Sequence, residues 1–300
     1  REKVDKTIVY TGDGFVNGLH SFGTILKHEP WKKSMELKEV NTIITGGDSF
    51  TDMAGSWREQ LSNRNYDVHS AAIGSAGNNM ISRATIKVTS KLLDEGKKPY
   101  VMACWSSLNR YSFMVEPQVQ FGMSSYKILS GGNPFSLLHE HMPAPGGVVN
   151  FKDYPFVWLQ SPGGHALEGG IVEDKRLQKF WVDFYKNYYN DELEILENLE
   201  HFLKLQWFCK SHDLDYKFFF GWKHLDKSMV DNLSDNTRHL WNLIDWDKWW
   251  FCDDNYGGIN EWTEQIGMTD EERFCSPGDN HPSLKAHTRF TNEVISKWIS

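Results

Sequence analysis

Cysteine is scarce in this sequence, and the spacing of the few cysteines argues against two kinds of site. The chain of 300 residues holds four, namely Cys104, Cys209, Cys252 and Cys275, and none of them forms a Cys-x-x-C pair. A structural zinc site or a dithiol redox motif usually contains such a pair. We therefore expect buried thiols that act as small apolar side chains. A disulfide between Cys252 and Cys275 is the alternative that the sequence leaves open.

Long apolar runs and basic clusters are missing as well. Runs such as residues 217–222 are far shorter than the ~20 residues of a membrane-spanning helix. The 40 acidic residues outnumber the 32 basic ones, and no basic stripe offsets the net charge of −8, so we expect no nucleic-acid partner. No apolar stretch follows the first six residues, so we expect no secretory signal here. A larger parent protein and a homo-oligomer both stay open.

Tryptophan, in contrast, is abundant. The chain has 13 tryptophans, and five of them fall close together in the sequence, at positions 241, 246, 249, 250 and 262. Packing in the core is one interpretation of this excess. The other is a wall of exposed rings that stack on sugars, because such rings are flat and partly apolar.

Strand-like and helix-like segments alternate in the first part of the chain. Residues 40–45, 67–73 and 99–105 are short and rich in apolar or β-branched side chains, and we expect each to form a strand. Such alternation with helices predicts a parallel sheet covered on both faces, and therefore an α/β fold. The other expected elements are strands at 7–10 and 215–220 and helices at 50–64, 81–95, 173–212 (with a break near Asn190), 236–246 and 283–299.

Residues 111–172 interrupt this pattern. The segment is rich in glycine and proline, as in Pro143-Ala144-Pro145-Gly146-Gly147. We expect a long, structureless insertion over the carboxyl ends of the strands that sets substrate specificity, within a single domain of residues 1–300. His139-Glu140-His141 lies in this insertion, but no third ligand is evident, so we expect no metal and no cofactor.

Polar residues gather where the expected strands end, which is where open parallel sheets bind ligands. Gly47-Asp48-Ser49 follows the strand at 40–45 and opens a helix, where free N–H groups stabilise negative charge. Gly74 to Asn79 and Ser106 to Arg110 follow the next two strands. Asp279-Asn280-His281-Pro282 precedes the last helix, and an acid near a histidine can orient its imidazole. Each block alone also fits a helix cap or a turn.

Together and in this order, the four blocks resemble the SGNH (GDSL-type) hydrolase family. Gly47-Asp48-Ser49-Phe50-Thr51-Asp52 matches its first block closely, and Asp279-Asn280-His281-Pro282-Ser283 matches its last. The resemblance covers residues 40–110 and 270–300. It implies a three-layer α/β/α sandwich with a mainly parallel, flavodoxin-like sheet. The Ser-x-x-Asn-Arg and Asp-x-His-Pro-Ser motifs are also similar to sequences carried by bacteriophages of marine bacteria.

The resemblance also implies a role for each matching residue. Ser49 would be the nucleophile, His281 its general base and Asp279 the acid that orients His281. The oxyanion hole would combine the N–H of Ser49, the N–H of Gly77 and the side chain of Asn109. We prefer Gly77 to Gly74 because a polar residue that opens the next helix follows it.

Two further residues are expected to bind substrate, and the chain departs from the family pattern at two places. Arg110 and Asn78 are the expected substrate-binding residues. The usual Asp-x-x-His spacing is one residue shorter here, since position 278 is glycine, and the usual Gly-x-Asn-Asp block reads Ser107-Leu108-Asn109-Arg110.

A serine, a histidine, an acid and hydrogen-bond donors suffice for acyl transfer to water. No Gly-x-Ser-x-Gly, phosphate-binding loop or dinucleotide motif is present. We expect a serine esterase that removes O-acyl groups, acetyl above all, from a carbohydrate. A lipase or lysophospholipase is the first alternative, and a glycan-binding module on a decayed hydrolase fold is the second. An acyltransferase is weaker, because nothing identifies a donor.

Overall fold

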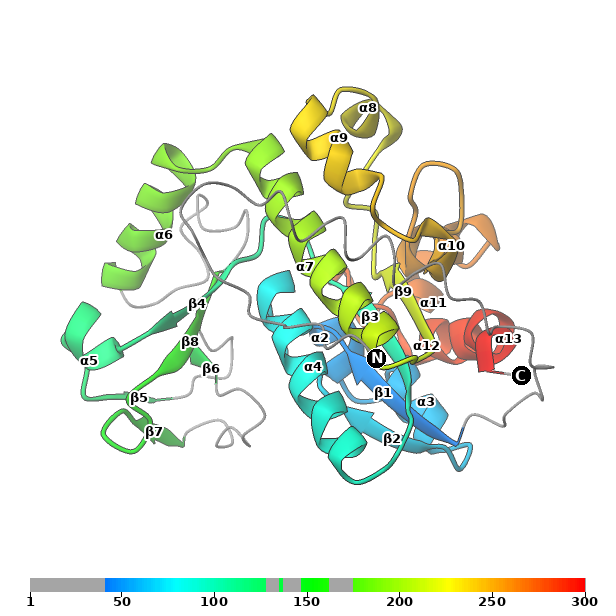
Figure 1. Cartoon of the computed structure of the whole chain (residues 1–300), viewed down its shortest axis with the longest axis horizontal. Helices are drawn as coiled ribbons and strands as arrows, with labels where there is room; N and C mark the ends of the chain where they lie inside the picture. The colour runs from blue at the N-terminus through cyan, green and yellow to red at the C-terminus, as the bar shows by residue number, and fades with distance from the viewer. Residues whose placement is uncertain (1–40, 128–134, 137–146, 162–174, 300) are drawn as a thin grey trace, which may run out of the picture. The chain divides into compact units, whose positions relative to one another are not determined.

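The computed structural model describes residues 41–127, 135–136, 147–161 and 175–299 (Figure 1). Contacts divide the chain into two compact units, Arg1–Glu39 and Val40–Ser300, and every described residue belongs to the second. The strand expected at residues 7–10 and the motif His139-Glu140-His141 lie outside the described residues.

The centre of the second unit is a parallel sheet of five strands in the order β10-β9-β3-β1-β2. Four of the predicted strands are confirmed with slightly different ends. The strands are β1 (Thr42–Gly46), β2 (Asp67–Ser70), β3 (Tyr100–Trp105), β9 (Tyr216–Phe220) and β10 (Trp249–Trp250). The edge strand β10 was not predicted, because a two-residue strand has too few residues to show an alternating pattern.

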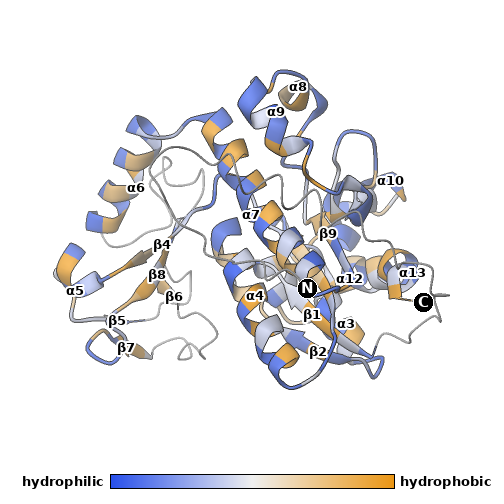
Figure 2. Cartoon of the chain, viewed as in Figure 1, coloured by the Kyte–Doolittle hydropathy of each residue, from blue (hydrophilic) through white to orange (hydrophobic). Residues whose placement is uncertain are grey.

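Helices cover both faces of the sheet, as the alternation of elements predicts. On one face, Ile44, Val101 and Phe218 pack with helices α4 (Asn78–Asp94), α7 (Asp191–Ser211) and α9 (Asp235–Trp241). On the other face, Ile43, Met102 and Phe219 pack with α3 (Trp57–Ser62), α10 (Ile259–Gln265), α12 (Leu284–Phe290) and α13 (Ser296–Ile299). Figure 2 colours the ribbon by hydropathy and shows apolar residues alternating with polar ones along α4 and α7. The described part is therefore an α/β fold compatible with a three-layer sandwich.

Most predicted helices are present, with different boundaries. The segment 50–64 forms two short helices, α2 (Ser49–Asp52) and α3, rather than one. The expected break near Asn190 is confirmed between α6 (Lys175–Asn187) and α7, where the Asn190 side chain accepts from two backbone N–H groups and caps α7. The last helix runs from α12 to α13 through a π-helical turn at Thr291–Ile295. The helix expected at 236–246 is shorter: α9 ends at Trp241, and a separate short helix follows at Trp246–Lys248. The short helices α8 (Lys227–Asp231), α10 and α11 (Asp270–Arg273) were not predicted.

The segment 111–172 differs from its prediction. Its described residues are not structureless: they form two small antiparallel sheets, β4-β8-β6 and β5-β7. Their elements are β4 (Ser112–Val115), α5 (Pro117–Gln120), β5 (Ser125–Lys127), β6 (Phe135–Ser136), β7 (Val148–Asn150) and β8 (Val157–Gln160). Phe135, Leu159 and Trp181 of α6 bury one another in a third apolar cluster. Strands of two to four residues between glycines and prolines leave no readable period, which is why the sequence did not reveal them.

The tryptophan cluster is part of the core. Trp241, Trp249 and Trp262 are at most 9% exposed, and Trp246 and Trp250 pack half-buried against the two main clusters. The five rings therefore do not form one exposed wall, because three of them are buried. In the described ranges, no helix has both the length and the apolar character that a membrane crossing requires.

The cysteines follow their main prediction only in part. Cys104 and Cys209 are buried, whereas Cys252 is half-buried and Cys275 is exposed. All four thiols are free, so the alternative of a disulfide between Cys252 and Cys275 is wrong.

Candidate active site

Ser49 lies where β1 ends and α2 begins, at the carboxyl edge of the sheet. Asp48 caps α2, because its Oδ1 accepts the N–H of Phe50 at 3.0 Å. Ser49 itself is the first residue of α2, and the first N–H groups of a helix have no partner within the helix. The backbone N–H of Ser49 is therefore suited to meet negative charge that develops on the oxygen of a bound group next to the Ser49 hydroxyl.

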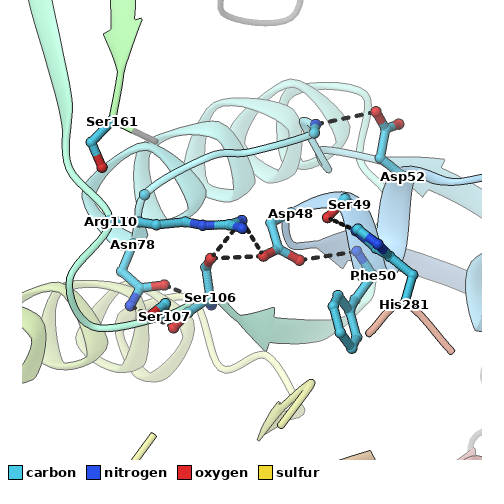
Figure 3. Close-up of polar contacts among 12 residues, drawn as sticks. Asp48, Ser49, Phe50, Asp52, Asn78, Ser106, Ser107, Arg110, Ser161 and His281 are labelled. Carbon is cyan, nitrogen blue, oxygen red and sulfur yellow. Dashed lines mark hydrogen bonds and ion pairs between the residues drawn. The ribbon is translucent and has the colours of Figure 1, made fainter. Parts of the chain in front are cut away.

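The structure brings Ser49, His281 and Asp279 into one hydrogen-bonded chain. The Oγ of Ser49 lies 2.8 Å from Nε2 of His281, and Nδ1 of His281 lies 2.6 Å from Oδ1 of Asp279 (Figure 3 draws the serine–histidine pair). An ionised carboxylate only accepts hydrogen bonds, so Nδ1 carries the proton and Nε2 is left to accept from the serine hydroxyl. This is the arrangement in which a histidine acts as the base of a nucleophilic serine.

A tight turn directs Asp279 toward His281. The N–H of Asp279 donates to the carbonyl of Ser276 at 3.1 Å, across Pro277 and Gly278, and Gly278 has a φ of +80°. A proline followed by a residue with positive φ is typical of a type II turn, in which glycine is favoured at that position. Position 278 is therefore occupied by a turn glycine, and the acid stands one residue later. Its carboxylate still reaches the imidazole, despite the shorter spacing.

The charge of Asp279 is stabilised locally. Partial burial opposes its ionisation, but the backbone N–H of His281, at 2.9 Å, and the imidazole outweigh this and lower the pKa of Asp279. Asp279 and His281 both keep 36% of their side-chain surface exposed. The acid therefore remains charged at neutral pH, and substrate and water can reach the base.

The loop that carries the histidine is held by backbone contacts. The N–H of Cys275 donates to the carbonyl of His281 at 3.0 Å, and the N–H of Ser283 donates to the carbonyl of Arg273 at 2.7 Å. Asn260 of α10 donates from its amide to the carbonyl of Asn280 at 3.0 Å. Ser283 also caps α12, so His281 stands at the entrance to the last helix.

The other side of Ser49 is a buried polar network around Asp48. The carboxylate of Asp48 is 1% exposed, and its Oδ2 accepts from Ser106 Oγ at 2.7 Å and from Arg110 Nη1 at 2.9 Å (Figure 3). A buried carboxylate needs such a partner, because an unpaired charge in the interior is costly. Arg110 was expected to bind substrate. In this structure its Nη1 neutralises Asp48 and thereby supports the helix that carries the nucleophile.

Asn78 does not lie free for substrate, contrary to its expected role. The residue is 1% exposed, and its amide bridges the N–H of Ser106 at 2.8 Å and the side chain of Asn198 at 2.6 Å. Asn198 in turn donates to the carbonyl of Leu108 at 2.9 Å. Asn78 therefore fixes the loop after β3 rather than contacting a ligand.

Gly77 is not placed as expected either. Its N–H donates to Ser112 Oγ at 2.9 Å, and an added Cβ would lie 2.5 Å from the carbonyl oxygen of Arg110. This glycine is needed for close packing of two loops, and its N–H already has a partner. We therefore correct its assignment as an oxyanion donor. Gly74, the neighbouring glycine, donates its N–H to Asp52 Oδ2 at 3.2 Å.

Asn109 is oriented by its neighbours. Its Oδ1 accepts from Ser107 Oγ at 2.7 Å, which leaves the amide nitrogen as the donating end. The backbone carbonyl oxygen of Asn109 accepts from the hydroxyl of Tyr185 at 2.6 Å, and this hydroxyl also lies 2.9 Å from Ser161 Oγ. Burial raises the pKa of Tyr185 to about 12, so this hydroxyl stays protonated. Ser161, directly after β8, and Tyr185 of α6 thus brace the loop that carries Asn109.

An aromatic wall beside the triad escaped the sequence reasoning. The ring centroid of Phe50 lies 5.3 Å from that of His281 and 4.5 Å from that of Trp222, and the guanidinium of Arg110 lies 5.8 Å from the Trp222 ring. Trp222 directly follows the glycine at the carboxyl end of β9, and that position was a signal that could have identified it.

In the described ranges, no group of three potential ligand side chains is placed to hold a metal ion. Neither the protein-family models nor the curated proteins include one that matches this chain.

Proposed function

We propose that this chain is a serine esterase with the three-layer arrangement and the mechanism of the SGNH hydrolases it resembles. The single observation that carries the proposal is the chain from Ser49 through His281 to Asp279, with its separations of 2.8 and 2.6 Å. These residues are distant in sequence, and the contact between Ser49 and His281 spans 232 positions. A fold that unites them at the carboxyl edge of a parallel sheet supports a catalytic role.

The reaction begins with attack by the serine. The Oγ of Ser49 bonds to the acyl carbon while Nε2 of His281 takes the hydroxyl proton, and the carbonyl oxygen becomes an oxyanion. The N–H of Ser49 and the amide nitrogen of Asn109 are the proposed donors to it; one such donor is typically worth about 3 kcal/mol. His281 then protonates the departing alcohol. Water, activated by the same histidine, releases the carboxylic acid and restores Ser49.

The proposed substrate is an O-acyl, chiefly O-acetyl, group on a carbohydrate. The support is the surface beside Ser49, where the half-buried Trp222 ring packs on the buried Phe50 and lies next to the guanidinium of Arg110. Sugars present both kinds of surface, and aromatic rings next to polar groups suit them. The shorter acid–histidine spacing is one of the two departures that favour a decayed, binding-only module, and it still permits the 2.6 Å contact.

Hydrolysis of a chain-length series tests this function. Purified protein is assayed on nitrophenyl acetate, butyrate, octanoate and palmitate and for acetate release from acetylated glycans, alongside Ser49→Ala. Ser62→Ala, which alters an exposed serine on α3, is the matched control. We expect turnover that favours acetate and is lost only in Ser49→Ala. A preference for palmitate would support the lipase alternative, and folded protein that hydrolyses no ester would overturn the proposal.

A further inference from the structure

A hollow that none of the triad residues lines lies beside the edge strand β10 of the main sheet. This cavity, of about 540 Å³, is formed by β10 with the loop after it, by α10, and by the helical run from Thr291 to Ile299. It shares no residue with the triad or with the Asp48 network. Its volume falls within the range of small-molecule sites. Its lining residues are Trp250, Phe251, Cys252, Trp262, Gln265, Ile266, Glu293, Val294, Lys297 and Trp298.

Three tryptophans dominate the apolar part of this cavity. Trp250 alternates with the buried Trp249 along β10, so its ring points to the α10 and α13 face of the sheet. The ring centroid of Trp298 lies 6.2 Å from that of Trp250, and Trp262 packs at 5.6 Å on Phe290, which also contacts Trp250. These rings rest on the core on one side and line the cavity on the other, so they are held in place before a ligand arrives.

Polar side chains stand around the rings. Glu293 and Lys297 are one helical turn apart, and Gln265 is the last residue of α10. The carboxylate of Glu293 is fixed by Arg289, whose Nε and Nη2 donate at 2.7 and 3.2 Å. The amide of Gln265 donates to Asp253 at 3.1 Å. The cavity thus offers a held carboxylate, an exposed ammonium group and an amide within a frame of indole rings.

We propose that this cavity binds a pyranose unit of a glycan. A pyranose has a C–H face that packs on indole rings and a rim of hydroxyls that hydrogen-bond to carboxylate, amide and ammonium groups. A purely apolar ligand would fit less well, because it would remove water from Glu293 and Lys297 and offer no hydrogen bonds in place of those that the water made. The site does not depend on the proposed esterase activity and would hold a glycan at a point separate from Ser49.

Sugar binding to the Ser49→Ala protein tests the site without turnover. The probes are the methyl β-pyranosides of glucose, galactose and N-acetylglucosamine. Their binding is measured by saturation-transfer NMR and by tryptophan fluorescence. We expect at least one to bind with a Kd on the order of 1 mM, which is a weak affinity that suits a single sugar. Adding Trp298→Ala should weaken the binding of that sugar at least about 10-fold. Trp207→Ala, which alters a ring that is 53% exposed on α7, is the matched control and should leave it unchanged.

A second variant guards against a folding failure of Trp298→Ala. Lys297→Ala changes an exposed residue and should weaken binding of the same sugar by several-fold. Its circular dichroism spectrum and melting temperature should match those of the Ser49→Ala protein. Binding that persists in both cavity variants would overturn the proposal, as would the absence of binding by all three sugars. Neither result would bear on ester hydrolysis by the wild-type protein, so the two proposals fail separately.

Discussion

The two sides of Ser49 are built differently. On one side, Asp48 and Arg110 meet within a buried network, and the Asp48 carboxylate is 1% exposed. On the other side, Asp279 and His281 form a simple hydrogen-bonded pair and keep 36% of their side-chain surfaces exposed. The first side fixes the nucleophile, and the second can exchange protons with substrate and water.

This difference separates positioning from chemistry. Removing one member of a buried charge pair leaves the other uncompensated and weakens the fold. Removing an exposed side chain usually changes stability by no more than about 0.5 kcal/mol. Substitutions on the network side should therefore reduce stability and activity together, whereas substitutions on the triad side should reduce activity alone.

The largest expected effect belongs to the triad side. His281→Ala should lower kcat/KM by about 10⁴-fold or more, because the serine loses its base. Asp279→Asn should lower it by about 10³- to 10⁴-fold, since the amide no longer favours the Nδ1–H tautomer. Steady-state kinetics on nitrophenyl acetate and a melting curve for each variant check both points. A large fall in melting temperature for either variant would break the contrast between the two sides.

The network side should give the next largest effect, and it should appear in stability. Arg110→Met keeps much of the side-chain volume but leaves Asp48 without its cation. We expect a loss of about 2 kcal/mol in the free energy of unfolding, less than for a fully buried pair because Arg110 is 21% exposed. Urea unfolding measures this loss. Arg110→Lys should recover only part of it, and an unchanged midpoint for Arg110→Met would show that the pair does not support α2.

Two buried titratable groups, His287 near the triad side and Glu194 near the network side, make stability respond to pH in opposite ways. On the triad side, burial and then the charge of His281 lower the pKa of His287 to about 3. The unfolded chain takes up that proton below about pH 6.5, so this contribution to stability is lost as pH falls. On the network side, burial raises the pKa of Glu194 to about 7, whereas the unfolded residue ionises near 4.5. Its contribution is therefore lost as pH rises from about 4.5 to 7.

Two variants should separate these opposing contributions. As pH rises from 4.5 to 8, the free energy of unfolding of Glu194→Gln should increase relative to that of wild type by up to about 3 kcal/mol. As pH falls from 7 to 5, the free energy of unfolding of His287→Asn should increase relative to that of wild type by up to about 1.4 kcal/mol per pH unit. Urea midpoints across this pH range measure both slopes. Parallel curves for a variant and the wild type would show that the substituted group does not titrate on unfolding.

The smallest expected effect concerns the turn before Asp279. Gly278→Ala places a Cβ on a backbone with a φ of +80° and should destabilise the protein by about 1 kcal/mol. It should also lower kcat by several-fold, because the turn aims the acid. Gly267→Ala, at a φ of +75° with open space around it, is the control that carries the same backbone strain. Equal activity of the two variants would show that the turn has no part in catalysis.

The sequence predicted those parts of the molecule that short patterns encode. The strands β1, β3 and β9 are runs of apolar residues that end at polar or glycine-rich turns, and the nucleophile block directly follows one of them. Ser49, His281 and Asp279 were predicted as a set and come together in the structure.

The missed features depend on tertiary contacts. Asn78 and Gly77 stand in a suitable loop, but partners that are 28 and 35 positions away engage them. The pairing of Arg110 with Asp48 spans 62 positions, and no local pattern announces it. The small strands of the segment 111–172 are stabilised by packing against α6, which lies outside that segment.

Labelling by a fluorophosphonate probe tests the central claim most directly, because such a probe reacts with a serine only when its hydroxyl is activated. Wild type, Ser49→Ala, His281→Ala and Arg110→Met are compared by the rate of labelling. We predict rapid labelling of wild type, none in Ser49→Ala, a loss of at least about 10³-fold in His281→Ala, and a smaller loss in Arg110→Met. Folded wild-type protein that stays unlabelled, or labelling that survives in Ser49→Ala, would contradict the assignment of Ser49 as an activated nucleophile.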